Sequence, residues 1–198
     1  MLFFATFCRA MVVLNLPEEI LTDRLSLRRL RYEDAEEIFY TYASKPEVTR
    51  FVSWPTHKTL QDTNAFLRYA INAWDEGTDY TFAVRLKDNN RLIGSIGVIN
   101  ENGKLQFGYV FSPTQWNKGY ATEVCVCLMH LLRTQPGVHR IQSFVDAENV
   151  SSAKVLIKSG LIEDARLDRW FRFVNQNNEA KDCILFKLPL DGRKDHSG

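Results

Sequence analysis

The stretch Gln106-Phe-Gly-Tyr-Val-Phe-Ser-Pro-Thr-Gln-Trp-Asn-Lys-Gly-Tyr-Ala-Thr-Glu123 decides the fold of this chain. Its first part is rich in aromatic and β-branched residues, which predicts a strand that ends at Phe111. Pro113 then favours a turn, because its ring fixes one backbone angle and removes a hydrogen-bond donor. A helix is predicted to begin near Gly119 or Tyr120. The stretch is therefore a strand, a loop and the start of a helix.

The predicted helix start has the properties of an anion site. The first turn of a helix leaves N–H groups without intrahelical partners and carries partial positive charge, so it can hold a pyrophosphate. Gly119 and Ala121 keep bulky side chains away from that backbone, and Lys118 adds a cation. A turn of this kind with a single glycine is equally compatible with a plain connecting loop.

A second segment with possible chemistry is Asp146-Ala-Glu-Asn-Val-Ser-Ser-Ala-Lys-Val-Leu-Ile-Lys-Ser-Gly-Leu161. Asn149 and Ser152 lie three residues apart at a predicted helix start that follows a strand. Taken by itself, this pair favours a helix cap with a neighbour rather than a binding site.

Outward from these two segments, strands and helices alternate. Hairpin signals at 87–90 and 100–103 predict an antiparallel meander over 80–111. The strands are predicted at 24–30, 80–86, 91–99, 104–111, 139–145, 162–174 and 180–188, and the helices near 35–42, 60–76, 121–133 and 150–159. The fold class is α+β: a mixed, mostly antiparallel sheet of about seven strands flanked by about four helices, not a doubly wound sheet.

Composition is that of one globular domain. Of 198 residues, 45% are hydrophobic and 25% charged, and 25 Lys plus Arg balance 24 Asp plus Glu. This near neutrality gives no general attraction to nucleic acid or to an anionic membrane. The four cysteines, at positions 8, 125, 127 and 183, lack metal-type spacing, so reduced thiols in the cytoplasm are expected.

The two ends of the chain are expected to lie outside the domain. Residues 1–16 are apolar but carry Arg9 and no basic residue before it, which disfavours a secretory signal. The stretch is also shorter than the roughly 20 apolar residues that cross a bilayer. We interpret 1–16 as an N-terminal extension, with Met11 a candidate start, 17–190 as the single domain and 191–198 as a polar tail.

The two segments together resemble a known family. The run W-N-K-G-Y-A-T-E (116–123) resembles the acetyl-CoA pyrophosphate loop of the GNAT superfamily of N-acetyltransferases, and N-x-x-S-x-x-V-x-x-K-x-G-L (149–161) resembles its second cofactor motif. Thr22-Asp-Arg-Leu-Ser-Leu-Arg-Arg-Leu30, Trp54-Pro-Thr-His57 and Leu92-Ile-Gly94 look like the Rim-type branch, which acetylates ribosomal proteins. The match runs from about 22 to 188 and implies the GNAT acyl-CoA N-acyltransferase fold.

The resemblance assigns roles to individual residues. The strand before the loop is expected to bulge and to separate from its neighbour, so that the pantetheine arm lies on its free edge. Ser152 is the expected proton donor to the thiolate, and Tyr109 is the second candidate. Asn117 and Trp116 depart from the family's usual glycine and Arg or Gln, although a Trp is usual in the Rim-type branch. The residues expected to bind acetyl-CoA are Tyr109, Val110, Phe111, Trp116, Asn117, Lys118, Gly119, Tyr120, Ala121, Thr122, Asn149 and Ser152.

The acceptor side is less defined. The resemblance places it at 50–57 and the last strand turn, with Trp54 and His57 as candidate substrate-binding residues. Many relatives have an acid where this chain has Gln106, and an amide cannot accept a proton at neutral pH. The general base is then Glu47, His57, Glu123 or a chain of waters.

The implied function is acetyl-CoA-dependent N-acetylation of a primary amine by direct transfer in a ternary complex. A protein N-terminus is the expected acceptor, and a small amine such as a polyamine, aminoglycoside or amino acid is the alternative. A non-catalytic acyl-CoA-binding module is the alternative of another class. No metal, nucleic acid or membrane partner is expected, and the chain is expected to be a monomer or homodimer.

Overall fold

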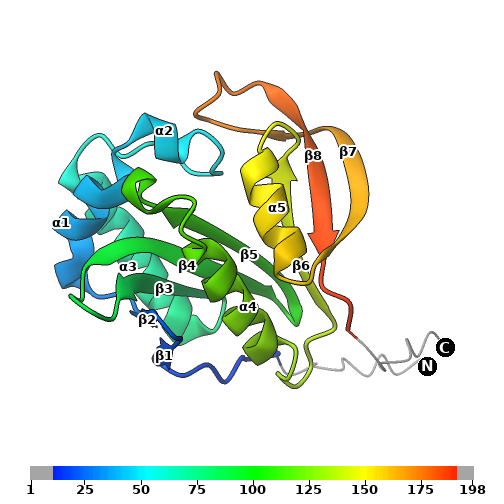
Figure 1. Cartoon of the computed structure of the whole chain (residues 1–198), viewed down its shortest axis with the longest axis horizontal. Coiled ribbons are helices and arrows are strands. Elements are labelled where there is room, and N and C mark those ends of the chain that lie inside the picture. Colours follow the sequence, from blue (N-terminus) through cyan, green and yellow to red (C-terminus); the bar gives the residue numbers. More distant parts are fainter. Residues whose placement is uncertain (1–10, 191–198) are drawn as a thin grey trace, which may run out of the picture.

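A single eight-stranded sheet runs through the computed structural model, which describes residues 11–190 (Figure 1). Its strand order is β1-β2-β3-β4-β5-β6-β8-β7, and every neighbouring pair is antiparallel except β5–β6. The strands are β1 (Glu19–Leu21), β2 (Leu25–Arg29), β3 (Asp79–Leu86), β4 (Leu92–Glu101), β5 (Lys104–Phe111), β6 (Arg140–Asp146), β7 (Ile162–Arg172) and β8 (Ala180–Lys187). The predicted α+β class is confirmed, with β1 as one strand more than expected.

Helices cover both faces of this sheet. They are α1 (Ala35–Ile38), α2 (Pro46–Thr49), α3 (Leu60–Glu76), α4 (Tyr120–Leu132) and α5 (Val150–Lys158), and a π-helical turn, Phe39–Ala43, continues α1. One buried cluster joins α4 and α5 to the sheet, and a second joins the α1 and α3 segments to it. The sheet therefore separates two hydrophobic cores.

The longest helix, α3, shows why the sequence signals work. Thr59 and Asp62 form a capping box, in which each side chain accepts a hydrogen bond from the other's backbone. Gly77 ends the helix in a left-handed conformation with φ +74°, which a glycine adopts without steric cost. Both predicted ends of this helix are confirmed.

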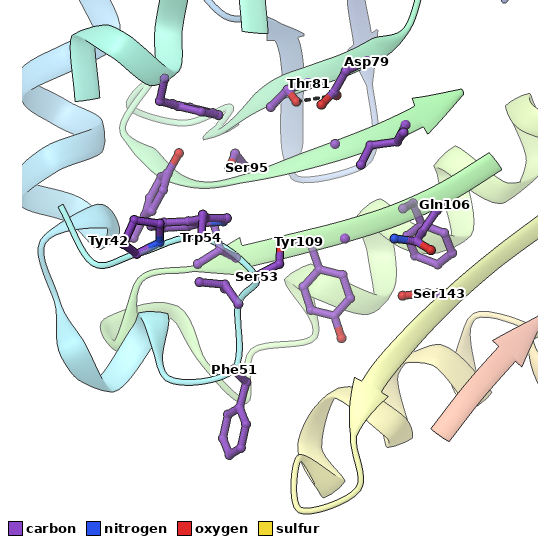
Figure 2. A pocket seen from close by; sticks show the side chains of 18 of the residues that line it. Tyr42, Phe51, Ser53, Trp54, Asp79, Thr81, Ser95, Gln106, Tyr109 and Ser143 are labelled. Atoms are coloured by element: carbon purple, nitrogen blue, oxygen red, sulfur yellow. Dashed lines mark hydrogen bonds between the residues drawn. The ribbon is translucent and has the colours of Figure 1, made fainter. Parts of the chain in front are cut away.

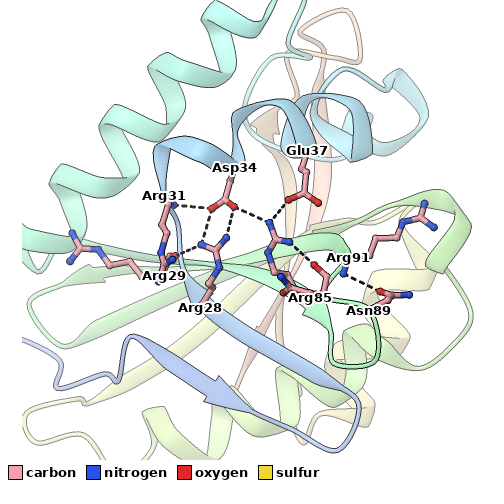
Figure 3. Close-up of polar contacts among 9 residues, drawn as sticks. Arg28, Arg29, Arg31, Asp34, Glu37, Arg85, Asn89 and Arg91 are labelled. Carbon is pink, nitrogen blue, oxygen red and sulfur yellow. Dashed lines mark hydrogen bonds and ion pairs between the residues drawn. The ribbon is translucent and has the colours of Figure 1, made fainter.

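A buried ionic network fixes α1 to the sheet (Figure 3). Asp34 pairs with Arg28 at 2.5 Å and with Arg85 at 3.0 Å, and Arg85 also pairs with Glu37. Asp34 is buried together with Arg85, so this network orients the helical layer that covers one face of the sheet.

Strands β5 and β6 run together only at their beginning. Three residue pairs, ending at Gln106–Gln142, form the parallel ladder, and the strands then diverge (Figure 1). In contrast, β5 pairs with β4 without any register shift from Glu101–Lys104 to Gly94–Phe111. The expected separation is present, but the expected bulge in β5 is not. The outer edge of β5 after Gln106 is therefore free of a strand partner within the described chain.

The described part of the predicted N-terminal extension packs on the domain. Leu14 is 4% exposed, and its backbone N–H donates to the Tyr80 hydroxyl at 3.0 Å. Leu16 is also buried, so the domain begins several residues before the predicted boundary at 17. The expectations for 1–10 and 191–198 fall outside the described residues. Within 11–190, no helix has the length and apolar character that a membrane span requires.

Candidate active site

The loop before α4 has the backbone that an anion requires. Gly119 is the N-cap of α4 with φ +79°, and Asn117 also has a positive φ of 61°. No side chain caps this helix, so the N–H groups of its first turn remain available to a ligand. A positive φ at position 117 favours glycine or asparagine. Asparagine tolerates this conformation better than most other residues, which explains how Asn117 takes the place of the family's usual glycine.

Arg24, which sequence reasoning did not single out, holds this loop from its position just before β2. Its guanidinium donates to the Lys118 carbonyl at 3.0 Å and lies 4.4 Å from the centre of the Tyr120 ring. It also pairs with Glu123 at 2.6 Å. Its only signal in the sequence was its place in the Rim-type motif at 22–30.

The same contacts remove Glu123 from the candidate bases. Its carboxylate accepts hydrogen bonds from the Thr22 hydroxyl at 2.6 Å and from the backbone and side chain of Arg24. Partial burial alone raises the pKa of Glu123, but these hydrogen bonds outweigh it and lower that pKa. Glu123 therefore joins α4 to the start of β2.

Trp116 and Lys118 shape the loop through side-chain contacts. The Trp116 indole N–H donates to the Phe111 carbonyl at 2.8 Å, and the Lys118 amine donates to the Gln115 side chain at 3.0 Å. These bonds link the end of β5 to the approach of α4. Contacts among residues 111–118, together with the Arg24 contact, therefore hold the loop in place.

Tyr109 and Ser152 meet across the opening between β5 and α5. The Tyr109 hydroxyl donates to the Ser152 carbonyl at 3.4 Å. Burial raises the pKa of Tyr109, so its hydroxyl keeps its proton at neutral pH. Asn149 caps α5 by accepting a hydrogen bond from the Ser152 N–H at 3.1 Å, which leaves its amide NH₂ for a ligand. The structure thus brings Tyr109 of β5 together with Asn149 and Ser152 of the second cofactor motif.

A cavity of about 530 Å³ lies on the opposite face of the sheet (Figure 2). Its floor includes Gly97 and Gly108, which face each other in the β4–β5 ladder. Nothing lies within 4 Å of the position that a Gly108 Cβ would take, so the space above β5 is open. Trp54 and His57 line this cavity, as expected, with ring centres 5.2 Å apart.

The candidate bases differ in their access to the cavity. His57 is 9% exposed, and its Nδ1 lies 2.9 Å from the Thr63 hydroxyl. Burial lowers the pKa of His57, with a smaller opposing effect of Asp62, so the imidazole is neutral at pH 7. Glu47 is exposed on α2 and outside the cavity lining, whereas the Gln106 amide is part of that lining.

Asn175, in the turn between β7 and β8, anchors the loop that carries Trp54, which the family resemblance leads us to expect on the acceptor side. Its side-chain oxygen accepts from the Thr56 N–H at 3.0 Å and from the Thr56 hydroxyl at 3.1 Å. Its NH₂ group donates to the carbonyls of Thr49 and Trp54 at 2.7 and 2.8 Å. One amide therefore uses its whole hydrogen-bonding capacity to hold the segment that carries Trp54.

An Asn175→Ala variant is expected to raise the KM for the acceptor about fivefold while that for acetyl-CoA stays unchanged, because only the acceptor loop loses its anchor. Four lost hydrogen bonds, at about 1 kcal/mol each, should also lower the melting temperature by several degrees. Initial-rate kinetics and thermal melting measure both effects. The exposed neighbour Asn177, replaced by glycine, is the control, and an equal rise of both KM values would contradict the anchoring role.

Within residues 11–190, no group of three or more His, Cys, Asp or Glu side chains is placed to hold a metal ion. The described site thus consists of a backbone anion loop, the contact of Tyr109 with Ser152 and a cavity of about 530 Å³.

Comparisons with known proteins agree with this geometry. The family described as Acetyltransferase (GNAT) domain matches residues 24–162. A Bacillus licheniformis protein described as the uncharacterized N-acetyltransferase p20 is 30% identical over 155 residues, covering 74% of this chain and 86% of that protein.

Two solved structures share the fold. RimL, a ribosomal L7/L12 alpha-N-protein acetyltransferase in complex with coenzyme A, superposes with a TM-score of 0.78 at 14% identity, over 88% of this chain and all of that one (100%). The ribosomal-protein-S5-alanine acetyltransferase of Vibrio fischeri has a TM-score of 0.76 at 18% identity, over 89% and 98% of the two chains. With the family match over most of the chain, these findings show that the chain belongs to the GNAT acetyltransferase family and is an N-acetyltransferase.

Proposed function

We propose that this enzyme transfers the acetyl group of acetyl-CoA directly to the primary amine of a protein N-terminus. The observation that carries the proposal is the contact of the Tyr109 hydroxyl with the Ser152 carbonyl. It crosses the opening between β5 and α5, where β5 and β6 have diverged. The uncapped start of α4 lies at one side of this opening, and the cavity lies on the other face of the sheet. Thioester and amine then reach the same strand edge from opposite faces.

The residues of the opening fit acetyl-CoA. The backbone from Tyr109 to Phe111 has a free edge for the pantetheine amides, and the N–H groups of 117–122 suit the pyrophosphate. Trp116 and Lys118 support that loop, and the Asn149 amide is placed to donate to the pantetheine arm. These assignments include Tyr120, Ala121 and Thr122 through their backbone N–H groups, and Val110 as the residue of β5 between the two that present the free edge.

The reaction needs one bond formed and one broken. The neutral amine attacks the thioester carbon, the C–S bond breaks, and the amine's proton leaves as the thiolate gains one. Ser152 or Tyr109 supplies the proton to sulfur, and a main-chain N–H near Val110, that of Tyr109 or Phe111 on the free edge of β5, stabilises the oxyanion. His57 is the candidate base that lines the cavity, and a chain of waters past Gln106 serves equally.

The acceptor assignment has two candidates. The Rim-type structural neighbours support a protein N-terminus. The aromatic lining of the cavity, which includes Trp54 and Phe66, supports a small amine as the second candidate. We place the enzyme in the cytoplasm, which fits the free thiols of Cys125, Cys127 and Cys183, and as a monomer or homodimer.

Thiol release from acetyl-CoA, measured with a panel of peptides, polyamines, aminoglycosides and amino acids, tests the proposal. Peptides with a free N-terminus are expected to give a kcat/KM at least about tenfold above that of the other amines. The same peptides with a blocked N-terminus are the control. A higher kcat/KM for a small amine than for the peptides would favour the small-amine acceptor over the protein N-terminus. Thiol release that needs no acceptor would contradict amine transfer.

A further inference from the structure

Asp79 is a buried carboxylate in the cavity wall. It is 8% exposed and stands at the start of β3 (Figure 2). The Thr81 hydroxyl donates to one of its oxygens at 3.0 Å, and the Tyr69 hydroxyl donates to the other at 3.2 Å. Both donors are neutral, so the carboxylate keeps its negative charge and further acceptor capacity toward the cavity.

No cationic side chain among residues 11–190 forms an ion pair with Asp79. A buried charge is costly unless a partner offsets it. Burial accordingly raises the pKa of Asp79, with the hydrogen bonds from Thr81 and Tyr69 opposing that effect. In contrast, the buried Asp34 outside this cavity pairs with two arginines. A cationic ligand could therefore offset the charge of Asp79.

The position of Asp79 excludes direct removal of the reacting amine's proton. A Cβ atom on Gly97 would lie 3.6 Å from the Asp79 carboxylate, so the carboxylate lies above β4. Gly97 pairs with Gly108 of β5, and the reactive thioester belongs at the far edge of β5. Two strand spacings, about 10 Å, separate a thioester lying beside that edge from the carboxylate above β4. A general base needs hydrogen-bond contact or one bridging water, and this distance is greater.

The rest of the cavity suits a cation. Trp54, His57 and Phe66 follow one another, with ring centres 5.2 and 6.2 Å apart, and aromatic faces attract alkylammonium groups. His57 is neutral at pH 7 and adds no competing positive charge.

We propose that Asp79 binds a second cationic nitrogen of the acceptor, about 10 Å from the amine that is acetylated. This inference rests on the proposed function, because it uses the thioester position at β5. The recognised chemistry is a primary amine joined by an apolar spacer to an ammonium or guanidinium group. A peptide N-terminus followed by a basic side chain and a free aliphatic diamine both supply it, and the open space above Gly108 leaves room for the spacer.

Two matched acceptor pairs test this assignment with the full-length protein. One pair is an α,ω-diamine, chosen from a series of increasing length, against the monoamine of the same length. The other is a peptide with lysine at its second position against the same peptide with norleucine there. In the wild type, the charged member of at least one pair is expected to have a kcat/KM about tenfold higher, the usual size of a charged hydrogen bond. The pair that shows this preference identifies the source of the cation.

The Asp79→Asn variant is expected to lose this preference while it keeps its activity on the uncharged member of the pair. Glu76→Gln removes the same charge from the exposed end of α3 and should keep the preference. Retained activity on the uncharged acceptor shows that Asp79→Asn is folded. A preference that survives in Asp79→Asn, or that is absent in the wild type, overturns the proposal.

Calorimetry separates this inference from the proposed function. If no amine is acetylated, the proposed function fails, and binding of the diamine and of the lysine peptide to the CoA-saturated protein still tests Asp79. Binding that is about tenfold weaker in Asp79→Asn than in Glu76→Gln supports the cation site. Equal binding by the two variants, or none by the wild type, overturns it.

Discussion

A Gly119→Val variant is expected to bind acetyl-CoA at least about 100-fold more weakly than the wild type, a loss of about 2.7 kcal/mol. Gly119 has φ +79°, and a β-branched residue reaches that conformation only at a cost of about 1–3 kcal/mol. The backbone would turn away from this conformation, and the N–H groups of the first turn of α4 would no longer converge on the pyrophosphate. The added side chain would also approach the Arg24 guanidinium, which lies 3.5 Å from the Cβ position.

Titration calorimetry with CoA measures this loss, and Gly160→Val is the matched control. Gly160 has φ +89° at the end of α5, so the same substitution introduces similar strain away from the loop. Both variants should lose stability, but only Gly119→Val should lose CoA affinity. Equal affinities for CoA in the two variants would show that the pyrophosphate does not bind at the start of α4.

A Ser152→Ala variant is expected to lower kcat by about 10–100-fold while the KM for acetyl-CoA changes little. The hydroxyl would act on the sulfur only as the C–S bond breaks, and an interaction made mainly in the transition state affects turnover rather than ground-state binding. General acid assistance typically contributes about 10²–10⁴-fold, and the neighbouring Tyr109 hydroxyl replaces part of it.

Two variants on the same helix sharpen this test. Asn149→Ala should weaken acetyl-CoA binding first, because its NH₂ group would contact the bound pantetheine in both states. Ser151→Ala changes the exposed neighbouring serine and should behave as the wild type. Steady-state kinetics distinguishes the three. A Ser152→Ala enzyme with unchanged kcat would transfer the donor role to Tyr109, and Tyr109→Phe would then show the loss.

Local signals predicted most of the fold. The capping box of Thr59 with Asp62, the stop at Gly77 and the two hairpin turns of the meander all depend on neighbours within a few residues. The strand β1 was missed because three residues carry no alternation. The bulge expected in β5 came from the family and not from the residues, and β5 keeps a regular register.

The site was predictable where it is local in sequence. The 106–123 and 146–161 segments each form one strand-to-helix junction, so their residues could be nominated from the sequence. Asp79 could not, because its place above Gly97 follows from strand pairing across twenty residues. Asn175 acts on Thr56, and Arg24 on Lys118, across still longer separations. Glu123 was a plausible base until those distant partners were located.

The placement of the two cores on opposite faces of the sheet has a kinetic consequence. The cavity lies against the core of α1 and α3 and meets the opening beside α5 at Tyr109, Ser143 and Phe144, so a fresh acceptor could enter it while spent CoA is still bound. Such an abortive complex holds both ligands and no acetyl group. High acceptor concentration should then slow turnover wherever CoA release limits the rate, and added CoA should deepen that inhibition.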